Sequence, residues 1–82
     1  MATRKDTREQ RAALRGYGLM GEALADEEYG KFLAAERKYS KAAIEFERAG
    51  LPREVDNANR WAARMNEREM ARRRRASRTR AR

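Results

Sequence analysis

The order of apolar and polar residues along the chain predicts helices and no strands. Val, Ile and Thr together supply only five residues, and no stretch alternates apolar and polar side chains as a strand would. The commonest residues, among them Ala, Arg, Glu and Leu, are good helix formers. The pattern therefore predicts an all-α protein, a small three-helix assembly that ends in a basic tail.

The clearest helical signal lies in residues 26–49, the second of the three segments. Its apolar residues recur every three, four or seven positions, which is the spacing of one helix face or of a short heptad seam. These residues are Ala25, Tyr29, Phe32, Tyr39, Ala43 and Phe46. We expect Asp26 to cap this helix and Glu27 to lie in its first turn. Gly50 and Pro52 are expected to end it.

A shorter helical segment is expected on each side of this one. The first, residues 4–15, begins with a capping-box pattern, and the glycines that follow predict a hinge over residues 16–21. The third, residues 53–71, has apolar residues on one face, and no helix breaker prevents it from continuing into the arginine run. We expect residues 1–71 to form one small domain and residues 72–82 to form a flexible basic tail.

The length of residues 26–49 leaves two interpretations open, which are one long helix or a hairpin that turns near residues 37–40. The spacing of five residues in this part resembles the Gly, Tyr, Ala, Phe and Ala positions of a tetratricopeptide repeat: Gly30, Tyr39, Ala42, Phe46 and Ala49. The resemblance covers residues 26–52, which is at most one repeat. It implies a helix hairpin that receives another helix or a peptide.

Charge adds to this picture because it is concentrated at one end. The chain of 82 residues has a net charge of +8, and residues 72–82 hold seven arginines and no acidic residue. Residues 1–71 are nearly balanced, with fourteen basic and thirteen acidic residues. A balanced body with a basic end is typical of a folded domain with an interaction tail. The GC-rich codons of a high-GC bacterium or its phage would explain why Arg outnumbers Lys, but not why the arginines cluster.

Arginine clusters of this kind bind phosphates, because the guanidinium group presents a fork of donors and contact with phosphate releases counterions. The expected nucleic-acid site combines the tail with an arginine row on the third helix: Arg60, Arg64, Arg68, Arg72, Arg73, Arg74, Arg75, Arg78, Arg80 and Arg82. A secondary basic face lies on the first helix, spaced four, three and four: Arg4, Arg8, Arg11 and Arg15. RNA is slightly favoured over DNA, since arginine-rich segments order readily on RNA.

The residue types that are missing narrow the function. Without His or Cys the chain has no imidazole base, no thiolate nucleophile and no soft metal ligand. Glycines 16, 18 and 21 spell G-x-G-x-x-G, but the dinucleotide motif needs a preceding strand. The acidic cluster is interpreted as charge at a helix N-terminus: Glu22, Asp26, Glu27 and Glu28. We therefore expect no enzyme activity, cofactor, metal site or small-molecule substrate.

A second functional class stays open. The helical body can be a protein-interaction module, such as an adaptor, an inhibitor or a subunit of a larger assembly, whose basic tail docks on an acidic protein. A chain this small has a thin core, which a homodimer or a partner bound through the amphipathic helices would stabilise. No apolar run approaches the length of a membrane span, and the first residues lack a secretory h-region. We expect a cytoplasmic protein, or a virion or host-cytoplasm protein if phage-encoded.

Overall fold

The described part of the protein consists of three helices and the two turns that join them. A computed structural model describes residues 4–81, with side chains for residues 8–79. The helices are α1 (Arg4–Glu28), α2 (Phe32–Arg48) and α3 (Pro52–Ala81), and the described part contains no strand. The prediction of an all-α, three-helix assembly is therefore confirmed.

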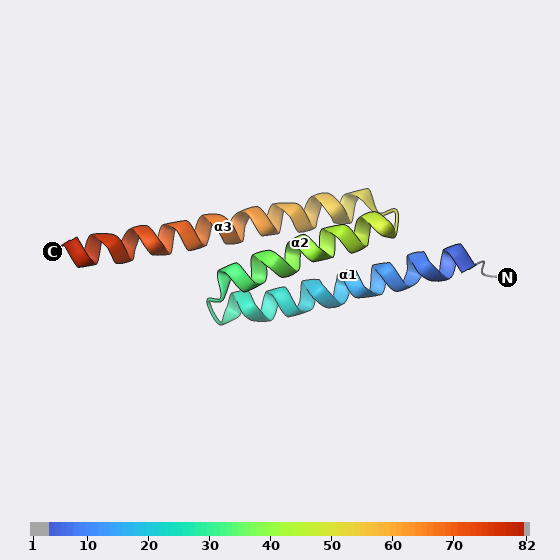
Figure 1. Ribbon diagram of the computed structural model, residues 1–82, viewed down its shortest axis with the longest axis horizontal. Coiled ribbons are helices and arrows are strands. Elements are labelled where there is room, and N and C mark those ends of the chain that lie inside the picture. The colour runs from blue at the N-terminus through green and yellow to red at the C-terminus, as the bar shows by residue number, and fades with distance from the viewer. Residues whose placement is uncertain (1–3, 82) are drawn as a thin grey trace.

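The helices run back and forth, with α2 between α1 and α3 (Figure 1). Both α1 and α3 pack along α2, and each runs past it at the opposite end of the molecule. The described residues span 66 × 19 × 12 Å. The start of α1 and the end of α3 thus extend from the three-helix body in opposite directions. Within the described residues, no helix is both long and apolar enough to cross a membrane.

Both turns are built around a glycine in the left-handed conformation. Gly30 has a φ of 74° and Gly50 a φ of 72°, which an L side chain rarely adopts. In each turn the residue after the glycine donates its N–H to the carbonyl four residues before the glycine, at 2.8 and 3.0 Å. Pro52 then begins α3, where its missing N–H costs nothing. The predicted stop at Gly50 and Pro52 is confirmed.

The core is thin and consists largely of alanine. The largest fully buried side chains are Tyr39, Phe46, Met65 and Glu69. Tyr39 and Met65 form one cluster with Ala23, and this cluster joins all three helices. The Tyr39 ring stacks on Trp61, with 6.1 Å between the ring centres. Phe46 is the largest side chain of a second cluster, which lies towards the turn between α2 and α3. Because alanine buries little area, the large apolar side chains in and against these two clusters carry most of the hydrophobic stabilisation.

The hinge predicted over residues 16–21 is wrong, because α1 runs through it unbroken. Gly16 packs against Phe46, and a Cβ placed on Gly16 would lie 2.6 Å from that ring. A single glycine costs a helix only about 1 kcal/mol relative to alanine. The packing of α1 on α2 outweighs this cost.

The predicted bounds of the second helix, residues 26–49, are also wrong at its start. Asp26 belongs to the end of α1, and α2 begins only after the turn at Gly30. Residues 37–40 lie inside α2, so the chain does not turn there. The resemblance to a tetratricopeptide repeat stays a prediction.

The third helix continues ten residues past its predicted end at residue 71. Residues 72–81 are helical, so the predicted end of the third helix at residue 71 is wrong, while the flexibility of the basic tail stays a prediction. Arg and Ala are good helix formers, and no Gly or Pro follows Pro52 to stop α3. Arg82 lies outside the described residues.

Candidate nucleic-acid interface

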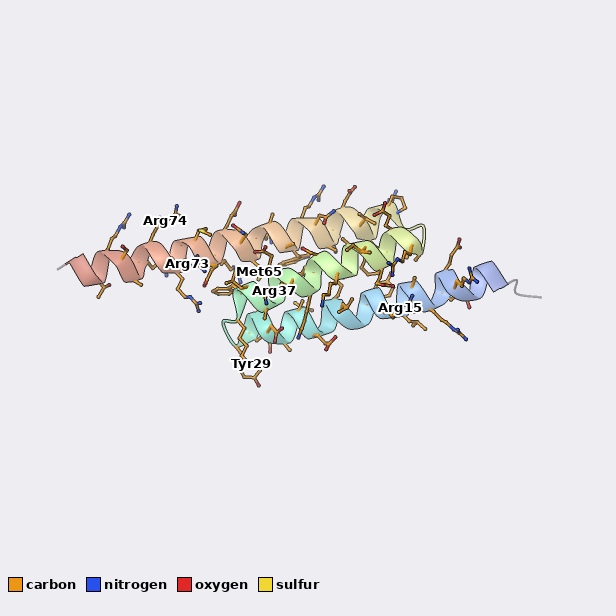
Figure 2. The ribbon with its side chains drawn as sticks, in the orientation of Figure 1. Arg15, Tyr29, Arg37, Met65, Arg73 and Arg74 are labelled. Carbon is orange, nitrogen blue, oxygen red and sulfur yellow. The ribbon has the colours of Figure 1, made fainter. Side chains whose placement is uncertain are left out.

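The last ten residues of α3, residues 72–81, are here called the arginine extension. Its described side chains, from residue 72 to residue 79, are all exposed. Within the described part, Arg74, Arg75 and Arg78 have no carboxylate partner. Successive residues of a helix are about 100° apart, so the arginines point to different sides, as Figure 2 shows for Arg73 and Arg74. The extension is positive all round.

Two of the predicted site residues, Arg68 and Arg72, are held by the fold. Arg68 Nη1 donates to Glu27 Oε2 at 2.8 Å, and Arg72 Nη1 donates to the carbonyl of Gly30 at 3.1 Å. Both guanidinium groups also lie over the Phe32 ring, 5.9 and 5.7 Å from its centre. These arginines therefore fasten α3 to the turn between α1 and α2. Their charge is partly compensated within the chain.

Glu69 gives Arg72 a second structural role. The Glu69 side chain is fully buried, and it accepts a hydrogen bond of 2.9 Å from Arg72 Nη2. Arg73 Nε lies 4.0 Å from the same carboxylate. A buried carboxylate that loses its cation strongly destabilises a fold. The main role of Arg72 is thus structural, because it pairs with the buried Glu69 carboxylate. Its position in the arginine row of the sequence did not indicate this role.

A groove opens where α3 passes the turn between α1 and α2. It has a volume of about 340 Å³ and is lined by Phe32, Arg68, Ala71, Arg72 and Arg75. Of its three arginines, only Arg75 has no carboxylate partner among the described residues. The groove therefore offers one uncompensated cation beside two fixed ones, which suits a phosphate group.

The remaining members of the predicted arginine row lie along the same helix. Arg60 is exposed, and Arg64 places its guanidinium carbon 4.9 Å from the centre of the Trp61 ring. This cation–π contact fixes the direction of Arg64 without neutralising it. Arg80 belongs to α3, but its side chain lies outside the described part, as does Arg82.

The secondary basic face lies at the opposite end of the molecule. Arg8, Arg11 and Arg15 of α1 line a groove of about 370 Å³ together with Arg48 of α2. Arg15 Nε and Arg48 Nη1 donate to Glu45, at 2.8 and 2.9 Å. No sequence pattern indicated Arg48, because only the pairing of α1 with α2 brings it to this groove. Arg4 lies in α1, with its side chain outside the described part.

The acidic cluster was predicted to lie at a helix N-terminus, and this prediction is wrong. The four acidic residues lie in the last turns of α1. Carboxylates at that end oppose the helix dipole, so other contacts must account for them. Lys38 Nζ forms an ion pair with Asp26 Oδ2 at 2.8 Å. Glu27 accepts from the Tyr39 hydroxyl at 3.0 Å as well as from Arg68. Asp26 and Glu27 thus tie α1 to α2 and α3.

These contacts shift two pKa values. The pKa of Tyr39 is raised to about 12, chiefly by burial and then by its hydrogen bond to Glu27. The pKa of Lys38 is raised by its contact with Asp26. Both side chains therefore stay protonated well above neutral pH.

No cluster of three or more His, Cys, Asp or Glu residues in the described part is arranged to hold a metal ion. Comparison of the chain with family models, curated proteins and solved structures gave no match.

Proposed function

We propose that this protein binds nucleic acid without catalysing a reaction, and that it grips phosphates with the arginine extension. One observation carries this proposal. Arg74, Arg75 and Arg78 are exposed on a helix that has no acidic residue after Glu69. Arginines at 60 and 64 assist along the same helix, while Arg68 and Arg72 hold α3 in place.

The helical form of the extension bears on the choice of nucleic acid. Neutralised phosphates release counterions, which gives affinity without sequence specificity. Arginine-rich segments of this kind insert into folded RNA, and an α-helix also fits the major groove of duplex DNA. We propose RNA as the ligand, and the experiment below includes duplex DNA as the alternative. We also propose that the protein acts in the cytoplasm, either of a bacterium or of a phage-infected host.

The test removes three charges in two different places. R74Q/R75Q/R78Q alters the exposed end of α3. The control K31Q/R37Q/K41Q removes as many exposed charges from the N-cap residue of α2 and from α2 itself. Each protein is titrated with an RNA hairpin, duplex DNA and heparin between about 0.05 and 0.2 M salt. We expect the first variant to lose at least tenfold in RNA affinity and the control less than threefold. The slope of log K against log salt should fall by about two to three for the first variant.

Four outcomes would change the proposal. Equal losses in both variants, or tighter binding to heparin than to RNA, would mean that only net charge is recognised. Tighter binding to duplex DNA would replace RNA by DNA. No binding by the unaltered chain at about 0.15 M salt, where the Debye length is about 8 Å, would overturn it.

A second candidate function, a helical protein-interaction module, is favoured by a separate observation. Leu14, Tyr17 and Leu24 of α1 are all about half exposed or more. In that case the basic end would dock on an acidic protein. Substitution of these apolar residues, rather than of the arginines, would then abolish function.

A further inference from the structure

One face of α1 is apolar and largely exposed, although the Tyr17 ring packs edge-on against Phe46 of α2, with 4.9 Å between the ring centres. Leu14, Tyr17 and Leu24 are 71%, 52% and 49% exposed. With Gly21 they are spaced three, four and three, the alternation of core positions in a heptad. We call Leu14, Tyr17, Gly21 and Leu24 the α1 seam. Such a row of exposed apolar side chains on one helix marks a contact surface.

The glycines of α1 support a close contact at this seam. Gly16 is explained by Phe46, but a Cβ on Gly18 or Gly21 would meet nothing within 4 Å. Each of these two glycines costs α1 about 0.5–1 kcal/mol relative to alanine. No contact within the described residues requires them. A second helix packed on this face would require Gly21, which lies in the row of apolar side chains, because a small residue lets two backbones approach.

The charges of α1 point to the orientation of that second helix. Its first half is basic, with Arg8, Arg11 and Arg15, and its last two turns are acidic, with Glu22 and Glu28 besides the paired Asp26 and Glu27. Both halves oppose the helix dipole. Two copies of α1 packed antiparallel would place the basic half of each beside the acidic half of the other. A parallel pair would bring like charges together.

We propose that the protein forms a homodimer through the α1 seam, with the two α1 helices antiparallel and crossing at residue 19. In this register Leu14 lies opposite the partner's Leu24, and Tyr17 lies opposite the partner's Gly21. The large Tyr17 side chain then packs over the partner's Gly21, and Leu14 packs against the partner's Leu24. Arg11 comes close to the partner's Glu28, and within the described residues of one chain neither has an ion-pair partner.

The dimer would also join the two basic surfaces. Because α1 and α3 run in the same direction, the start of α1 and the end of α3 lie at opposite ends of one chain (Figure 1). In the antiparallel dimer, the basic start of one α1 lies at the same end as the arginine extension of the other chain. This consequence rests on the proposed function, whereas the dimer itself does not.

The first experiment measures the molar mass of the full chain by sedimentation equilibrium without nucleic acid. We expect about 19 kDa at micromolar concentration, twice the 9.6 kDa of one chain. L14Q/L24Q alters only exposed side chains, so it should stay helical and become monomeric. I44Q is the matched control, since Ile44 is 51% exposed on α2 and outside the seam. It should remain a dimer.

The second experiment tests the orientation by reversing charges. R11E or E28R alone should weaken the dimer at least fivefold, since each brings like charges together, and R11E/E28R should restore it. A monomeric mass for the unaltered chain up to about 0.1 mM would overturn the dimer. A double variant no better than the single ones would overturn the antiparallel register. Because no nucleic acid is present, failure of the nucleic-acid proposal leaves these outcomes unchanged.

Discussion

Three glycines within six residues of α1 occur for different reasons. Gly16 has no side chain because Phe46 occupies the space, while Gly18 and Gly21 face open space. From the sequence all three predict a hinge, since glycine is the weakest helix former after proline. In the structure none of them interrupts the helix. The surroundings of each glycine, rather than its propensity, decide its role.

This difference predicts opposite effects of one substitution at two positions. Gly16→Ala should lower the free energy of unfolding by about 1–3 kcal/mol, because its Cβ would collide with the buried Phe46 ring. Gly18→Ala should raise it by up to about 1 kcal/mol through helix propensity alone. Urea denaturation followed by circular dichroism measures both. Equal effects at the two positions would contradict the packing role of Gly16.

Tyr39 predicts how stability depends on pH. Its pKa is raised to about 12 in the folded protein, whereas an unfolded tyrosine ionises near pH 10. Because the folded state holds the proton more tightly, this contribution to stability is complete below about pH 10 and is lost as pH rises towards 12. Tyr39→Phe should lose about 1 kcal/mol at pH 7, with the hydrogen bond to Glu27.

The stability of the same variant should decline less steeply than that of the unaltered chain between about pH 10 and 11.5. Urea denaturation midpoints measured across this pH range test the expectation. Part of the decline should persist, since the pKa of Lys38 is raised by Asp26 and loss of its proton also weakens the fold. An unchanged pH profile in Tyr39→Phe would show that the phenol does not contribute.

At the scale of elements, α3 has two parts with different support. Up to about Arg72 it packs on α2 and holds the first turn through Arg68 and Arg72. Beyond that point its described side chains are exposed, and the one hydrogen bond formed by the side chain of Thr79 stays within the helix. Crowded like charges destabilise a helix, so this part should gain stability from a polyanion.

We therefore expect Ser77→Pro to separate helix from charge. Proline at this position removes a helical hydrogen bond and clashes with the preceding turn. Helix content by far-UV circular dichroism should fall, while the free energy of unfolding should stay within about 0.5 kcal/mol of that of the unaltered chain, because Ser77 is exposed and lies beyond the packed core. Affinity for the RNA hairpin should fall at least threefold. Ser77→Ala, which keeps the helix, is the control, and equal affinity in both variants would mean that charge alone suffices.

At the scale of the whole molecule, core and charge occupy different regions. Residues 16–71 contain most of the core and are slightly acidic, with nine basic and eleven acidic residues, while both ends are basic. The elongated shape keeps the two basic ends apart in one chain. A dimer through the α1 seam would bring unlike ends together and add apolar contacts to a core made mostly of alanine.

The sequence by itself determined the helical class, the stop at Gly50 and Pro52, and the concentration of arginine at the C-terminus. Each is a local property, set by helix propensity, by a required backbone angle or by composition. Only the tertiary structure decided that Gly16 lies inside a helix, that Glu27 pairs with Arg68, and that Arg72 serves a buried carboxylate and the first turn. Such contacts join residues up to about forty positions apart. They depend on how three helices align, and no local pattern in one helix specifies that alignment.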